Sequence, residues 1–232
     1  MAVDLRGVTA VLLPGTGSDD DYVYRAFADP LHEAGAVVVA PSPQPDRLID
    51  GYVSELDNAA RLGAIAVGGV SIGAAVAVNW ALAHPTRVVA VLAALPPWTG
   101  SPETAPAAQA ARYSADVLRR DGLVSATSQM RASSPPWLAD ELARSWLGQW
   151  PALPDAMEAA SRYVSPTRAG LGALTAPMGV GAATDDPVHP LEVAIEWADA
   201  APRAALRTVT LDAMGVEPSV LGAACVTALF EL

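Results

Sequence analysis

Short apolar runs rich in β-branched residues alternate along this chain with longer stretches in which apolar residues recur at helical spacing. This alternation is typical of βα units on a parallel sheet, whose central strands are apolar because helices cover both faces. The short runs predict six strands, over 8–13, 36–40, 65–68, 88–95, 178–183 and 206–211. The sequence therefore predicts an α/β fold.

Helices are expected in the stretches that separate these runs. Residues 21–35 should form a helix that restarts at Asp29-Pro30, because aspartate caps a helix and proline suits its first position. Apolar residues every fourth position, from Leu48 to Ala60, predict a helix that lays one face on the sheet. Further helices are expected over 72–84, 191–200 and 219–230.

The stretch from Trp98 to about Thr175 carries no strand pattern. Four of its apolar residues recur at a spacing of four and predict an amphipathic helix, one of several in this stretch. These residues are Leu138, Leu142, Trp146 and Trp150. We therefore expect a helical insertion in the sheet domain.

Composition sets limits on the number of domains and on the partners. A chain of 232 residues, of which 52% are hydrophobic and 17% charged, can bury a sizeable core and fits one domain over 1–232. The net charge of -11 repels phosphate backbones and anionic lipids, which disfavours nucleic acid and membrane partners. A neutral or apolar small molecule suits it better. Nothing in the sequence indicates an oligomeric state.

Two segments bear on localisation. Residues 1–6 show no basic segment followed by an apolar run, so we expect no secretion signal and a cytoplasmic protein. The most apolar window, 67–83, contains three glycines, Ser71 and Asn79, which favours a buried strand and helix over a membrane span.

Metal and cofactor sites are not indicated. Cys225 is the single cysteine, which excludes an internal disulfide and a thiolate zinc site, and its helical spacing from Leu221 and Leu229 predicts a packed thiol. The loop Gly15-Thr16-Gly17 has neither a P-loop lysine nor a full G-x-G-x-x-G pattern. We therefore expect no cofactor.

The strongest motif is Gly69-Val70-Ser71-Ile72-Gly73, a G-x-S-x-G pattern between a predicted strand and a predicted helix. A serine on so sharp a turn sits in strained backbone, and glycines two residues away let the chain approach itself closely. The helix that follows directs free N–H groups at the serine, which favours an oxyanion. The alternative is a chance match in an ordinary βα turn.

The chain resembles the α/β-hydrolase superfamily over nearly its whole length. Four segments carry the resemblance: 14–17, the Ser71 motif, 79–88 and 185–190. The resemblance implies an open, mainly parallel sheet with helices on both faces and a helical cap, here about 98–175, over the site. The seven residues before Val8 are too few for the antiparallel hairpin with which the family often begins, so we expect an abridged version.

The resemblance also implies the groups around Ser71. The main-chain N–H groups of Thr16 and Ile72 correspond to the oxyanion hole, with Pro14 in the place of the usual loop histidine. Asp186 corresponds to the acid that orients the catalytic histidine, and Asp185 is the alternative. An aspartate before proline is also an ordinary turn or cap.

The family's histidine follows the last strand, but Val216 occupies that position here. A serine hydroxyl needs a base within hydrogen-bond reach, so the usual mechanism cannot run through this loop. His32 lies in the first helix and His84 ends the helix that leaves Ser71, both remote from the site. His189, three residues after Asp186, is the one substitute, although its place before Pro190 also suits a helix start.

Three functions are consistent with these residues. The first is an esterase-like or thioesterase-like serine hydrolase with Ser71 as nucleophile and an incomplete or non-standard triad. The second is a catalytically weak pseudo-hydrolase that binds a small apolar ligand. The third, a lyase or isomerase step in the same pocket, has no distinguishing residue, because a fold by itself does not select a reaction.

Overall fold

A computed structural model describes residues 3–232, so Met1 and Ala2, part of the segment in which we expect no secretion signal, lie outside the described residues. Six strands form one sheet in the order β2-β1-β3-β4-β5-β6, and every neighbouring pair is parallel. The strands are β1 Thr9–Leu13, β2 Val37–Val39, β3 Ile65–Val70, β4 Val88–Ala94, β5 Met178–Ala183 and β6 Ala204–Val209. The predicted α/β class and parallel sheet are confirmed.

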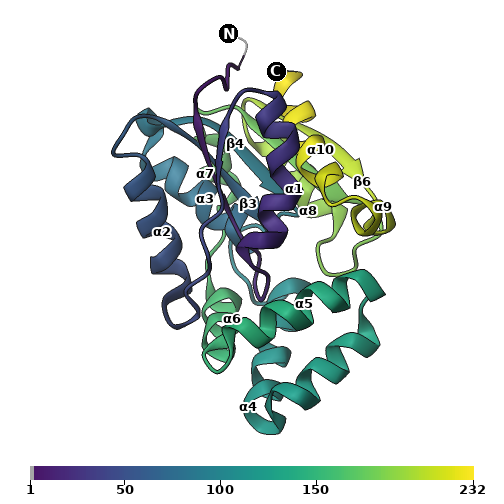
Figure 1. The fold of residues 1–232 in the computed structure, drawn as a ribbon. Coiled ribbons are helices and arrows are strands. Elements are labelled where there is room, and N and C mark those ends of the chain that lie inside the picture. Colours follow the sequence, from purple (N-terminus) through teal and green to yellow (C-terminus); the bar gives the residue numbers. More distant parts are fainter. Residues whose placement is uncertain (1–2) are drawn as a thin grey trace.

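Helices fill the connections between the strands (Figure 1). Their bounds are α1 Asp20–Glu33, α2 Leu48–Ala59, α3 Ile72–Ala83, α4 Pro106–Ser133, α5 Pro136–Gln149, α6 Leu153–Arg162, α7 Arg168–Gly172, α8 Leu191–Ala200, α9 Leu211–Val216 and α10 Ser219–Phe230. Two short 3₁₀ turns, η1 Pro45–Arg47 and η2 Pro85–Arg87, precede α2 and β4.

The two faces of the sheet carry separate cores, because side chains alternate along a strand. Val11, Val67 and Val91 pack beneath α2, α3 and α8 on one face. Leu12, Ala66 and Leu92 pack beneath α1 and α10 on the other. Helices therefore cover both faces, as predicted.

Cys225 belongs to the second of these cores. It is fully buried in α10 with Leu221 and Leu229, as their spacing predicts. Burial raises the pKa of its thiol to about 12, so the thiol stays protonated and packs as an apolar group.

The chain between β4 and β5 contains helices only. We call α4, α5 and α6 the cap; they lie together beyond one end of the sheet, away from both chain termini (Figure 1). The cap has its own apolar cluster, which includes Leu118, Trp146 and Leu153. Backbone of non-helical geometry at Gly122 divides α4 into two arms.

Several bounds differ from the predicted ones, and three of the differences concern α1, the last strand and α5. Residues 20–33 form one continuous helix that includes Pro30 and does not restart at Asp29. The helix continues here although Pro30 has no N–H to donate to the preceding turn. The last strand ends at Val209, because the Thr210 hydroxyl accepts a hydrogen bond from Ala213 N and starts α9. Trp150, which is expected on the apolar face of an amphipathic helix, lies just beyond the end of α5 and is 40% exposed.

The topology fixes where a site can form. The chain moves from β1 outward to β2, then back past β1 to β3 and on to β6, so the connections diverge between β1 and β3. Loops after the carboxyl ends of parallel strands meet at such a point. Among residues 3–232, no helix is both long and apolar enough to cross a membrane.

Candidate active site

Ser71 lies at the turn from β3 into α3, in backbone that a non-glycine residue rarely adopts. Its φ is 54° and its ψ is -118°, and the helix begins at the next residue. Ser71 N donates to Ala94 O of the neighbouring strand at 2.9 Å, and Ser71 O accepts from Ala75 N at 3.1 Å. These bonds hold the strained conformation.

The two glycines of the motif lie against β1. A Cβ on Gly69 would approach Leu13 O to 2.3 Å, and a Cβ on Gly73 would approach the same oxygen to 2.1 Å. Both distances are far shorter than any real contact of a Cβ atom. The turn can form only where no side chain lies between it and β1, so the two glycines of the motif have a steric cause. This explains the motif better than a chance match in an ordinary βα turn.

The imidazole of His189 lies between Ser71 and Asp186. Its Nε2 atom is 2.9 Å from Ser71 Oγ, and its Nδ1 atom is 2.7 Å from Asp186 Oδ2. With the ring proton on Nδ1, that N–H donates to the carboxylate and Nε2 accepts from the serine hydroxyl. The three side chains therefore form one hydrogen-bonded chain.

The loop after β5 supplies both the carboxylate and the imidazole. Asp186 Oδ1 accepts from Val188 N at 2.8 Å and His189 N at 3.3 Å, so a tight turn carries the base back over its own acid. Burial disfavours the charged form of Asp186, but the His189 hydrogen bond and charge and the two main-chain N–H groups outweigh it. They hold the pKa of this carboxyl below its ordinary value.

The other candidate residues from the sequence lie elsewhere. Asp185 Oδ1 accepts from Leu211 N at 2.8 Å and so caps the start of α9. His32 lies in the last turn of α1. His84 ends α3, at the opposite end of that helix from Ser71, where its ring packs on Trp80. Val216 is the last residue of α9, and 87% of it is exposed.

The two proposed oxyanion donors have different surroundings. Thr16 lies in the turn after β1 and lines the same cavity as Ser71. Gly15, next to it, is so close that a Cβ there would be 3.6 Å from Ser71 Cβ. Ile72 is fully buried and begins α3, and an N–H in this position has no partner within the helix.

A cavity of about 500 Å³ opens from Ser71 into the space between the sheet and the cap. Most of its lining is apolar. On the cap side, the first arm of α4 lines the cavity with a row of small side chains, Ala107, Ala110, Ala111 and Ser114. The cavity's two carboxylates are already engaged, Asp186 by His189 and Glu141 by Arg25 and Arg144. An uncharged ligand therefore suits it.

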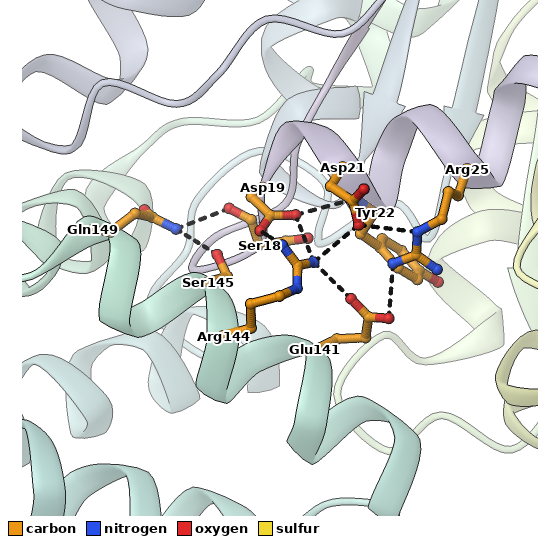
Figure 2. Close-up of polar contacts among 9 residues, drawn as sticks. All are labelled: Ser18, Asp19, Asp21, Tyr22, Arg25, Glu141, Arg144, Ser145 and Gln149. Atoms are coloured by element: carbon orange, nitrogen blue, oxygen red, sulfur yellow. Dashed lines mark hydrogen bonds and ion pairs between the residues drawn. The ribbon is translucent and has the colours of Figure 1, made fainter.

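One contact near the site carries no signal in the sequence. Side chains of α5 bond to Ser18, in the turn that contains Thr16, and to Asp19, the cap residue of α1 (Figure 2). Arg144 lies 125 positions from Asp19, its partner in two hydrogen bonds, so no local pattern could link them. No group of three or more acidic, histidine or cysteine side chains that could hold a metal occurs among residues 3–232.

Comparison with known proteins gives structural likeness only. No family model matches the chain, and no curated protein matches its sequence. A carboxylesterase of the thaumarchaeon Nitrososphaera gargenis is similar to this chain at a TM-score of 0.71 and 18% identity, covering 90% of this chain and 84% of that one.

Two further solved structures are similar at a TM-score of 0.67 each. The enol-lactonase of Burkholderia xenovorans is 17% identical over 89% of this chain and 84% of its own. A hydrolase of Pseudomonas aeruginosa is 21% identical over 97% of this chain and 90% of its own. The chain thus has the α/β-hydrolase fold.

Proposed function

We propose that this protein is a serine hydrolase that cleaves a carboxylic ester or a related acyl bond, with Ser71 as nucleophile, His189 as base and Asp186 as the orienting acid. The single observation that supports it most is the hydrogen-bonded chain Ser71–His189–Asp186, whose three residues line one cavity. The order of the three residues along the sequence is also that of α/β-hydrolase triads.

Each of these residues has a defined role in the proposed reaction. His189 Nε2 takes the hydroxyl proton as Ser71 Oγ forms a bond to the acyl carbon, and the carbonyl oxygen becomes negative. The main-chain N–H groups of Thr16 and Ile72 stabilise that oxyanion. The imidazolium, stabilised by Asp186, then protonates the leaving alcohol or thiol as its bond to carbon breaks.

Water completes the cycle. His189 takes a proton from a water molecule, whose oxygen attacks the acyl–Ser71 ester. Collapse of the second tetrahedral intermediate returns the proton to Ser71 Oγ and releases a carboxylic acid. One water is consumed, and no cofactor is needed in this scheme.

The triad in this proposal is complete but non-standard. Its base comes from the acid loop after β5, so Val216 at the usual position removes nothing from it. The low pKa of Asp186 supports the scheme, since an ionised carboxylate stabilises the imidazolium.

The cavity supports an uncharged, largely apolar substrate. A volume of about 500 Å³ is within the range of pockets that enclose a whole small molecule. The engaged carboxylates and the small side chains of α4 favour an apolar acyl or alkyl group over a charged one.

A panel of 4-nitrophenyl esters from acetate to decanoate tests this function. We expect turnover by the wild-type protein, a pre-steady-state burst of one 4-nitrophenol per chain, and no turnover by Ser71→Ala. A protein that binds the esters but releases no 4-nitrophenol would instead be the pseudo-hydrolase, a ligand-binding member of the same fold.

A further inference from the structure

The turn that carries Thr16 is held from two sides. On the sheet side, a Cβ on Gly15 would lie 3.4 Å from Val70 O, next to the strained Ser71. On the cap side, a Cβ on Gly17 would lie 2.7 Å from Trp146 Nε1 and 3.1 Å from Met157 Cε. Gly17 has a φ of 70°, and Ser18 N donates to Gly15 O at 3.0 Å, so the turn itself is a closed unit.

Side chains of α5 bond to Ser18, the last residue of this turn, and to Asp19, the residue after it (Figure 2). Gln149 Nε2 donates to Ser18 O at 2.9 Å and to Ser145 Oγ at 2.7 Å. Arg144 donates to both carboxylate oxygens of Asp19, at 2.6 and 3.1 Å. Arg144 and Gln149 lie five positions apart on α5, and both side chains bond to the same two-residue segment, Ser18 and Asp19.

The contact belongs to a larger ion-pair network. Arg144 also lies 2.8 Å from Glu141 and 3.2 Å from Asp21, and Glu141 in turn pairs with Arg25 at 2.7 Å. The Asp19 carboxylate, 15% exposed, accepts from Tyr22 N and so caps α1. Networks of this kind fix geometry better than an isolated surface pair does.

We propose that α5 sets the position of the Gly15–Ser18 turn, and that Arg144 and Gln149 are positioning residues for the Thr16 main-chain N–H. This inference rests on the proposed function. In this arrangement the cap contributes to the oxyanion hole as well as to the wall of the cavity. The sheet side supplies Ser71 and Ile72, whereas the cap side keeps Thr16 aligned with them.

Arg144→Gln and Gln149→Met test the proposal, with Arg131→Gln as the control. Arg131 pairs with Asp140 at 2.7 Å elsewhere in the cap, and its exposure of 47% matches the 48% of Arg144. We expect kcat for a short acyl ester to fall about 10-fold to 100-fold in both test variants, with KM changed by less than about 2-fold. The control should keep wild-type kcat.

A tetrahedral inhibitor separates positioning from a general loss of structure. Alkylboronic acids bind the serine as an anionic tetrahedral adduct, whereas the carboxylate product does not. We expect boronate affinity to fall by the same factor as kcat/KM and product affinity to stay unchanged. Arg144→Lys, which keeps the charge but loses the two-pronged contact, should recover part of the activity.

Amide hydrogen exchange over residues 14–20 decides the inference independently of activity. Exchange in this segment should be faster in Arg144→Gln and Gln149→Met, and unchanged in Arg131→Gln. Unchanged exchange, or equal kinetic losses in the control, would overturn the role of α5. If wild-type protein hydrolyses no ester, the proposed function fails, while the exchange result still decides whether α5 holds the turn.

Discussion

His189 Nε2 lies 2.9 Å from Ser71 Oγ, although the two residues are 118 positions apart and the ring is only three residues from the carboxylate that it contacts. Acid and base therefore sit on one short loop after β5, and their relative position depends on a local turn. The segment after β6, where the resemblance places the histidine, forms α9 instead, and its Leu211 and Met214 line the cavity.

His189→Ala should abolish most of the activity. Loss of the base leaves only the oxyanion donors and binding, so we expect kcat/KM on short acyl esters to fall by roughly 10³-fold or more. Adding Val216→His to this variant should not restore it, because the side chain at 216 is exposed at the end of α9. Recovery of turnover in the double variant would mean that the base acts from the loop after β6.

Removing the charge of Asp186 should make stability depend less on pH. Because the folded pKa of Asp186 is below its ordinary 3.8, ionised Asp186 stabilises the fold above that pH. The contribution is lost as pH falls through the lower folded value. Wild-type protein should therefore exceed Asp186→Asn in free energy of unfolding at pH 7, and the difference should shrink below about pH 4.

Urea unfolding of both proteins from pH 7 to pH 3 measures this difference. Asp140→Asn, which removes a 72% exposed carboxylate in the cap, is the control for losing a surface charge. A difference between wild type and Asp186→Asn that stays constant, or grows toward pH 3, is incompatible with a stabilising carboxylate at 186.

Two glycine substitutions should have opposite effects on stability. Gly73→Ala brings a Cβ against the Leu13 carbonyl, and we expect a loss of about 1–3 kcal/mol together with lower activity. Gly148→Ala in α5 meets no atom within 4 Å and should stabilise by up to about 1 kcal/mol. Thermal unfolding of the two variants measures both; equal effects would mean that the approach at Gly73 is not tight.

Filling the cavity wall should shift the preferred ester length. Ala111→Phe in the first arm of α4 projects a ring toward the cavity, so activity on decanoate should fall at least tenfold relative to acetate. Gln109→Phe adds the same ring on an exposed position outside the lining and serves as the control. An unchanged chain-length profile for Ala111→Phe would show that the acyl chain lies elsewhere.

Much of the fold could be predicted because its signals are local. The strands predicted at 65–68 and 178–183 are buried on both faces, and a strand so placed has a distinctive composition, although the first of them continues to Val70. Both 191–200 and 219–230 form helices with the predicted bounds. The apolar pattern puts the last strand two residues too late, because the apolar Leu211 continues the strand pattern although Thr210 already caps the next helix.

The site could be predicted only in part. The turn at Ser71 has a steric signature in its two glycines, whereas Asp186 is indicated by the resemblance alone, since an aspartate before proline is also an ordinary turn. The position of the His189 imidazole depends on how the 184–190 loop folds. No pattern of apolar and polar residues in the sequence predicts that loop conformation. The bond from Arg144 to Asp19 depends on where α5 docks, a tertiary property that helical spacing leaves open.

Labelling with a fluorophosphonate tests the central claim most directly, because this probe reacts only with a serine whose hydroxyl a nearby base activates. Intact-mass and peptide analysis should show one adduct per chain, on Ser71. Ser71→Ala should not react, and His189→Ala should react at least about 10³-fold more slowly. Absence of an adduct on wild-type protein, or equal labelling of Ser71→Ala, would contradict the account.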